Sequence, residues 1–76
     1  MGTSQLVIMA NEIAAFFVSE NEADASKNVA IHLRRYWDPR MRKQIIELLN
    51  AGGDGLVPAA RAAVELLAAD QPRVSS

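Results

Sequence analysis

The side chains best suited to chemistry in this 76-residue chain are concentrated in one stretch, HLRRYWDPRMRK, which runs from His32 to Lys43. It contains the only histidine of the chain, together with four arginines and one lysine. Histidine can transfer protons near neutral pH, and the arginine fork binds carboxylates and phosphates through paired hydrogen bonds. The stretch therefore suggests either proton transfer or the binding of a partner.

Proton transfer and metal binding find little support in the other residues. The chain has no cysteine, which excludes thiolate zinc sites and iron–sulfur clusters, and one histidine is too few for a dedicated metal site. His32 is expected to be partly buried and bonded to a backbone carbonyl or a carboxylate. The GGDG stretch at 52–55 lacks the strand and lysine of a phosphate loop, so it predicts a helix stop. We expect no catalytic residue, no metal ligand and no cofactor bound by this chain.

Charge is distributed unevenly along the chain, although the net charge is only −1. Six of the eight lysines and arginines fall between Lys27 and Lys43, where Asp38 is the only acidic residue. The ionised residues between Asn11 and Ser26 are all acidic. This local contrast is more informative about partners than the net charge.

The elements that must position these side chains are helices. Apolar residues recur at helical spacing, and no alternating run predicts a strand. Helices are expected over about 3–18, 21–36, 39–50 and 58–69. Together they predict an all-α fold, a small bundle of three to four short helices.

This bundle is expected to be a single helical domain over residues 1–70, followed by a flexible C-terminal tail over 71–76. The apolar run at 6–10 is far too short to span a bilayer, and the N-terminus does not resemble a signal peptide. A cytoplasmic protein without membrane contact is therefore expected.

Helical spacing also predicts which side chains form the core. On the first helix the shared face contains Leu6, Met9, Ala10, Ile13, Phe16 and Phe17. On the second helix the stripe contains Val29, Leu33, Tyr36 and Trp37. On the last helix Ala60, Ala63, Val64 and Leu67 face inward, while Arg61 and Glu65 form an exposed pair one turn apart. The apolar arc of the first helix is wide, so it needs more than one neighbour to cover it.

The dipeptide Asp38-Pro39 marks the clearest boundary in the sequence. Proline suits the first position of a helix and disfavours helical geometry in the residue before it, so Asp38 is expected to cap the third helix. Trp37 is expected to pack the corner between the second and third helices. The predicted structural motif comprises His32, Tyr36, Trp37, Asp38, Pro39 and Met41.

The cations around this corner predict a docking surface for another protein. Ile31 and Ile46 fall on the helical wheel among long cationic side chains, away from the centre of each apolar stripe. Apolar anchors inside a charged rim, with arginine favoured, are typical of protein interfaces. The predicted partner-binding residues are Ile31, Arg34, Arg35, Arg40, Arg42 and Ile46.

A small nucleic-acid-binding or regulatory protein is the alternative, because two helices joined by a short turn and carrying arginines suggest a helix-turn-helix. Against this, the connection lacks the usual glycine, and nucleic-acid-binding domains have a stronger basic bias overall. We rank this alternative second.

The segment HLRRYWDPRMRKQI, preceded by MANEIAAFF and followed by GGDGLVPAARAAVELL, resembles the delta subunit of cytoplasmic, NAD-dependent, molybdenum-containing formate dehydrogenases. The resemblance extends over roughly residues 6–67. Its most specific part is His32-x-Arg34-Arg35 followed by Trp37-Asp38-Pro39-Arg40-Met41-Arg42. The chain departs from the family pattern at Val57, where an aspartate or serine precedes the proline of the last helix.

The resemblance implies a non-catalytic accessory subunit whose partner is the large catalytic subunit of formate dehydrogenase. In such complexes formate is oxidised at a bis-molybdopterin guanine dinucleotide centre, and electrons pass through iron–sulfur clusters and FMN to NAD. Assembly, stability and insertion of the molybdenum cofactor are the roles that this implies for the small subunit. The sequence does not distinguish among them.

Overall fold

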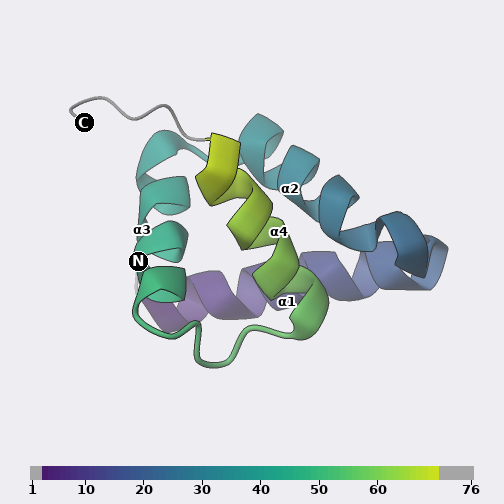
Figure 1. Cartoon of the computed structure of the whole chain (residues 1–76), viewed down its shortest axis with the longest axis horizontal. Helices are drawn as coiled ribbons and strands as arrows, with labels where there is room; N and C mark the ends of the chain where they lie inside the picture. The colour runs from purple at the N-terminus through teal and green to yellow at the C-terminus, as the bar shows by residue number, and fades with distance from the viewer. Residues whose placement is uncertain (1–2, 71–76) are drawn as a thin grey trace.

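The computed structural model describes residues 3–70, which form four α-helices and one short 3-10 turn. In chain order these are α1 (Thr3–Glu20), η1 (Glu22–Asp24), α2 (Ala25–Tyr36), α3 (Pro39–Asn50) and α4 (Pro58–Asp70), as Figure 1 shows. This part of the chain contains no strand. The predicted all-α fold is confirmed, and the expected tail over 71–76 lies outside the described residues.

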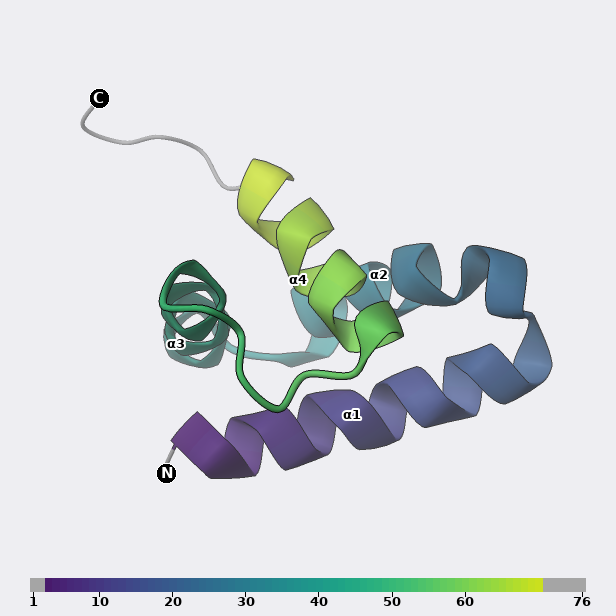
Figure 2. The ribbon, with the colours of Figure 1, turned by 60° about the horizontal axis from the view of Figure 1, so that its bottom comes forward.

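Helix α4 occupies the centre of the arrangement. In Figure 1, α1, α2 and α3 form the sides of a triangle, and α4 crosses in front of it; Figure 2 shows the same arrangement from another direction. Accordingly, α4 packs against each of the other three helices. Ala60 and Ala63 are completely buried on its inner face, and such small side chains allow helices to approach closely.

The core draws apolar side chains from every α-helix. The largest fully buried ones are Leu6, Val29, Leu33, Ile45, Val64 and Leu67. Full burial of a side chain of this size stabilises a fold by roughly 1.5–3 kcal/mol relative to its exposure to water. The inward-facing residues predicted for the last helix are all in this core.

The turn before α2 differs slightly from the prediction. Asn21 accepts a hydrogen bond from the Ala23 backbone N–H at 3.1 Å, and its side-chain amide donates to the Asp24 carboxylate at 3.3 Å. Asn21 therefore caps η1, as a helix-starting residue is expected to do, and α2 begins only at Ala25.

The corner between α2 and α3 forms as the sequence predicts. The Asp38 carboxylate accepts a hydrogen bond from the Met41 backbone N–H at 3.0 Å, and Pro39 is the first residue of α3. A cap of this kind contributes about 1 kcal/mol. Trp37 is buried beside it and joins the core, so it packs the corner.

Helix α3 ends in a Schellman motif, as the glycines predict. The Gly52 and Gly53 backbone N–H groups donate to the carbonyls of Leu49 and Leu48, at 3.0 and 2.9 Å respectively. Both glycines have positive φ angles, of 125° and 69°. Because L-residues rarely adopt such angles, glycine is the residue that permits this helix end.

The start of α4 is held by a residue far away in the sequence. Val57 has no side chain that could cap the helix, but its backbone N–H donates to the side-chain oxygen of Asn11, on α1, at 3.0 Å. The Asn11 amide also donates to the Gly55 carbonyl at 2.8 Å. Asn11 therefore fastens the loop before α4 to α1.

Three side chains lie elsewhere than the sequence predicted. Phe16 and Tyr36 were expected in the core, but they are 59% and 68% exposed, because α4 covers only one edge of the α1 and α2 stripes. Arg61 was expected in an exposed pair, but it is half-buried. Its guanidinium donates to the Gly52 and Gly53 carbonyls, at 2.8 and 3.2 Å, and so braces the loop after α3.

Candidate protein-interaction surface

Three of the predicted cations lie exposed around the turn between α2 and α3. Arg34 and Arg35 are in the last turn of α2, and Arg40 is in the first turn of α3. Cations are favourable in the last turn of a helix because its C-terminal carbonyls carry partial negative charge. We refer to Arg34, Arg35 and Arg40 as the basic corner.

An apolar patch lies directly beside the basic corner. Ile31 on α2 is 44% exposed, and Leu66 on α4 is exposed to the same extent. Both line a shallow depression of about 230 Å³, together with Lys27, Ala30 and Arg34. The sequence predicted Ile31 as an apolar anchor but not Leu66, which α4 brings to it from the far end of the chain.

Arg42 has a structural role that its sequence position did not reveal. Its guanidinium donates to the Arg34 carbonyl at 2.7 Å and to the Trp37 carbonyl at 3.2 Å. These carbonyls lie at the end of α2, where the helix itself leaves such groups unpaired. Arg42 thus ties α3 to the end of α2, and its role in binding a partner stays a prediction.

Ile46 is less accessible than Ile31. It is half-buried and packs against the core cluster. Its place in a partner surface is therefore also still a prediction, and Ile31 and Leu66 offer the more exposed apolar area.

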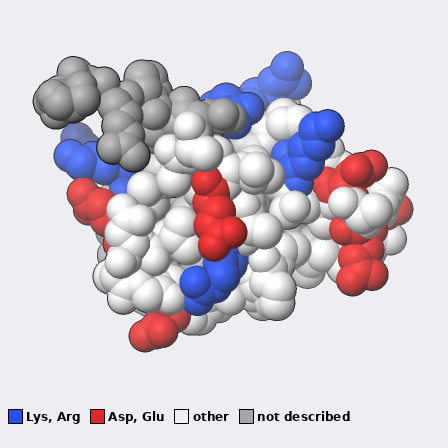
Figure 3. Space-filling model, viewed as in Figure 1, with Lys and Arg blue, Asp and Glu red and all other residues white. Residues whose placement is uncertain are grey.

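Two groups of charged residues lie at opposite ends of α2. Glu20, Glu22 and Asp24 are exposed around the corner between α1 and α2, while the basic corner lies at the opposite end of α2. In Figure 3 acidic side chains gather at the right, over the α1–α2 corner, and basic ones appear along the upper edge. The predicted contrast between acidic and basic segments is thus also a contrast in space.

His32 lies among aromatic rings. Its imidazole centroid is 4.8 Å from that of Tyr36 and 6.1 Å from that of Phe17. It is half-buried, as predicted, but the expected hydrogen bond to a carbonyl or carboxylate is absent from its contacts with residues 3–70. His32 therefore contributes to an aromatic cluster.

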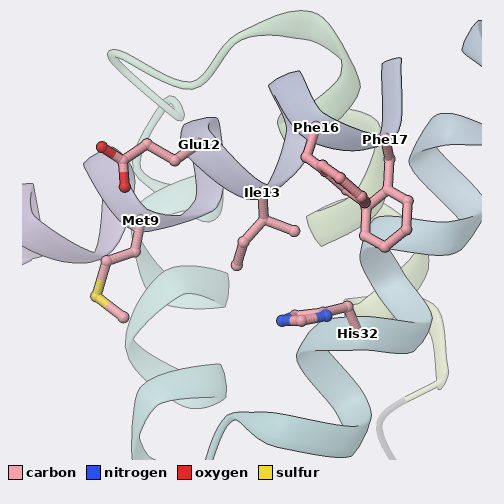
Figure 4. Close-up of a pocket in the computed structure, with 6 residues that line it drawn as sticks. All are labelled: Met9, Glu12, Ile13, Phe16, Phe17 and His32. Carbon is pink, nitrogen blue, oxygen red and sulfur yellow. The ribbon is translucent and has the colours of Figure 1, made fainter. Parts of the chain in front are cut away.

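This cluster borders a larger depression on the side of the triangle that α4 does not cover. The depression has a volume of about 490 Å³ and an almost entirely apolar lining. Figure 4 shows its lining residues, five from α1 and His32 from α2. We refer to it as the aromatic hollow, lined by Met9, Glu12, Ile13, Phe16, Phe17 and His32.

The aromatic hollow continues towards the basic corner. A second depression, of about 300 Å³, shares Phe17 and His32 with it and is also lined by Ile31, Arg35 and Tyr36. The apolar surface of α1 and the cations of α2 thus form one continuous face. The sequence predicted its cationic half, whereas Phe16 and Tyr36 were assigned to the core.

Two further features of the described part of the chain bear on metal binding and on membranes. Among residues 3–70, no three His, Asp or Glu side chains come together in a way that could hold a metal ion. Within the same range, no helix is both long and apolar enough to cross a membrane.

Comparison of the sequence with known proteins assigns the chain to a family. The family model described as NADH-dependent formate dehydrogenase delta subunit FdsD matches residues 5–64, which include the basic corner and the aromatic hollow. A search of curated proteins and a search of solved structures each found no significant match. The family match covers most of the chain, and the chain belongs to the delta-subunit family of NADH-dependent formate dehydrogenases.

Proposed function

We propose that this delta subunit is a non-catalytic accessory subunit, which binds the large catalytic subunit of formate dehydrogenase and supports its assembly, its stability or the insertion of its molybdenum cofactor. The observation that carries this proposal is the exposed apolar pair of Ile31 and Leu66 beside the basic corner. An apolar centre with an arginine-rich rim is the composition of a protein interface.

The cations suit an acidic partner surface. An arginine guanidinium binds a carboxylate through two parallel hydrogen bonds, which fixes orientation as well as adding affinity. Arg35 and Arg40 have no hydrogen-bond or ion-pair partner within the described residues, so the guanidinium groups of both are available to bind carboxylates of a partner. We therefore assign the contact to Ile31, Arg34, Arg35 and Arg40, with Leu66 added and with Arg42 and Ile46 at its border.

In this proposal the redox groups of the complex belong to other subunits. The chain has no cysteine with which to hold an iron–sulfur cluster. The bis-molybdopterin guanine dinucleotide, the clusters, FMN and NAD are accordingly assigned to the partners, and the complex to the cytoplasm. In this proposal, the chain contributes a binding surface for the large catalytic subunit.

Co-expression tests the proposal. The catalytic subunits are produced with and without this chain, and three quantities are compared: co-purification, molybdenum per catalytic subunit, and formate-dependent reduction of NAD. We expect the chain to co-purify with the large subunit, and its omission to lower the yield of intact complex or its molybdenum content. Full assembly, full metal content and full activity without the chain, together with an unchanged rate of thermal inactivation, would refute the accessory role.

The same experiment separates the three roles. A loss of molybdenum in an intact complex identifies cofactor insertion, whereas a loss of complex with normal molybdenum per remaining large subunit identifies assembly. Normal yield and metal content with faster thermal inactivation identify a stabilising role.

A further inference from the structure

The wide apolar arc of α1 is only partly covered within this chain. Helix α4 packs over one edge of the arc, while Phe16, on the other edge, is 59% exposed. On that uncovered edge lie the aromatic hollow and the depression that joins it to Arg35. Contiguous exposed apolar surface of this kind marks interaction sites in soluble proteins.

We propose that this groove, formed by the aromatic hollow and the adjoining depression, receives an amphipathic helix from another subunit of the formate dehydrogenase complex. The inference rests on the proposed function, because it takes the partner to be a subunit of that complex. It adds a second contact region and specifies the kind of segment that fits it.

The lining of the groove favours a helical occupant. Its wall is made mainly of apolar and aromatic side chains from two helices, with Glu12, Asn28 and Arg35 also in the lining, and it presents no strand edge. A segment that enters it finds few hydrogen-bond partners, so its backbone groups must be satisfied internally. A helix satisfies them, and helix-in-groove binding uses apolar anchors at positions i, i+4 and i+7.

Within this chain, α4 provides a direct precedent. It is a helix that packs against α1 and α2 on the opposite side from the groove, through side chains such as Val64 and Leu67. A helix bound in the groove would therefore pack against the free side of α1 and α2 in the way that α4 packs against their other side. Figures 1 and 4 show the two sides.

Charge at the two ends of the groove specifies the polarity of the occupant. Glu12 lines the aromatic hollow, whereas Arg35 lines the adjoining depression at the other end. A complementary helix carries a cation near Glu12 and a carboxylate near Arg35, with the apolar anchors between them. Charges placed in this way select orientation and exclude wrong partners.

A second copy of this chain fits the groove less well. A twofold dimer through this face would bring two concave surfaces together, and the aromatic hollow of each has a volume of about 490 Å³. Protein interiors and interfaces are close-packed, so such a void is unfavourable. A convex helix from a different subunit fills the same space.

Two matched substitutions on α1 test the groove. Phe16 lines it, whereas Ile8 is 57% exposed on the same helix and lines neither depression. We expect Phe16→Glu to raise the Kd for the purified catalytic subunits by about tenfold or more, and Ile8→Glu to change it by less than about threefold. Both side chains are exposed, so circular dichroism should show unchanged helicity for each variant.

Cross-linking then identifies the occupant. A photoreactive benzoylphenylalanine is placed at position 16, or at position 8 as the control, in the reconstituted complex. We expect position 16 alone to cross-link to a helical peptide of another subunit, one with apolar residues at i and i+4 and an acidic residue nearby. Cross-linking to a second copy of this chain, or equal cross-linking at both positions, would overturn the inference.

The outcomes distinguish this inference from the proposed function. If the chain co-purifies with the catalytic subunits but Phe16→Glu binds as tightly as the wild type, the groove is not used and the accessory role stands. If the unmodified chain does not associate with any subunit, both are wrong.

Discussion

Asn11, in the middle of α1, accepts a hydrogen bond at 3.0 Å from the backbone N–H of Val57, the residue that precedes α4. Its amide group donates in turn to the Gly55 carbonyl at 2.8 Å. Gly55 also packs closely against α1, because a Cβ atom added to it would lie only 3.3 Å from Cγ1 of Val7. One side chain thus substitutes for the missing local cap of α4 and holds the preceding loop against α1.

Replacing Asn11 should therefore destabilise the fold from a distance. Asn11→Ala removes both hydrogen bonds and is expected to lower the free energy of unfolding by about 1–3 kcal/mol. Urea unfolding followed by circular dichroism measures the change, with Gln5→Ala as a control at an exposed position on the same helix. Equal stabilities of the two variants would show that the loop is held by other contacts.

Arg61 and Gly53 should be energetically coupled. A Cβ on Gly53 would lie 2.9 Å from the Arg61 guanidinium, and the φ angle of 69° is itself unfavourable for alanine by roughly 1–2 kcal/mol. Gly53→Ala should therefore lower the free energy of unfolding more in the wild type than in an Arg61→Ala background, because only the backbone strain remains once the guanidinium is removed. A double-mutant cycle of unfolding free energies measures the difference, and strict additivity would refute the contact.

The adjacent aromatic residues Tyr36 and Trp37 should respond very differently to truncation. Trp37→Ala empties a buried corner and is expected to cost about 3–5 kcal/mol, enough to unfold much of a small domain. Tyr36→Ala removes a side chain that is 68% exposed and should cost less than about 1 kcal/mol. Thermal unfolding of both variants provides the comparison, and similar losses would contradict the assignment of Trp37 alone to the corner.

The basic corner should contribute to association through charge. Arg35→Gln with Arg40→Gln is expected to weaken binding to the catalytic subunits, roughly tenfold at low salt and less at high salt, because exposed charges are screened by ions. Ser4→Glu with Gln5→Glu is the matched control, since each pair of substitutions changes the net charge from −1 to −3. A similar loss of affinity in both double variants would indicate a general charge effect.

Nucleic acid provides a separate test of the same surface. We expect double-stranded DNA and RNA to bind only weakly at about 50 mM salt and not measurably at about 200 mM. Fluorescence anisotropy of labelled duplexes measures this directly. Tight binding with a steep salt dependence, abolished by Arg35→Gln with Arg40→Gln, would instead favour the nucleic-acid alternative.

The parts of the fold that the sequence predicted depend on local chemistry. Asp38 and Pro39 specify a helix start from within three residues, and Gly52 and Gly53 specify a helix end in the same way. The start and end of α3 and the buried position of Trp37 follow from these signals together with helical spacing.

The parts that the sequence did not predict depend on contacts between distant residues. Asn11 and Arg61 each bond to a loop outside their own helix, and helical spacing contains no information about such partners. Phe16 and Tyr36 belong to wide apolar arcs, and only the position of α4 decides which edge of each arc is covered. For the proposed interaction surface, the exposure of Arg34, Arg35 and Arg40 was predictable, whereas the half-buried position of Arg42 was not, and Leu66 joins them only through folding.

The central position of α4 also affects how the chain acquires its fold. Because α4 is synthesised after the three helices against which it packs, their inner faces cannot close during translation. Core side chains on these faces, such as Leu33 and Ile45, are fully buried only in the complete arrangement. We therefore expect a chain that ends before Pro58 to leave part of its apolar core uncovered, in a form that chaperones and proteases recognise.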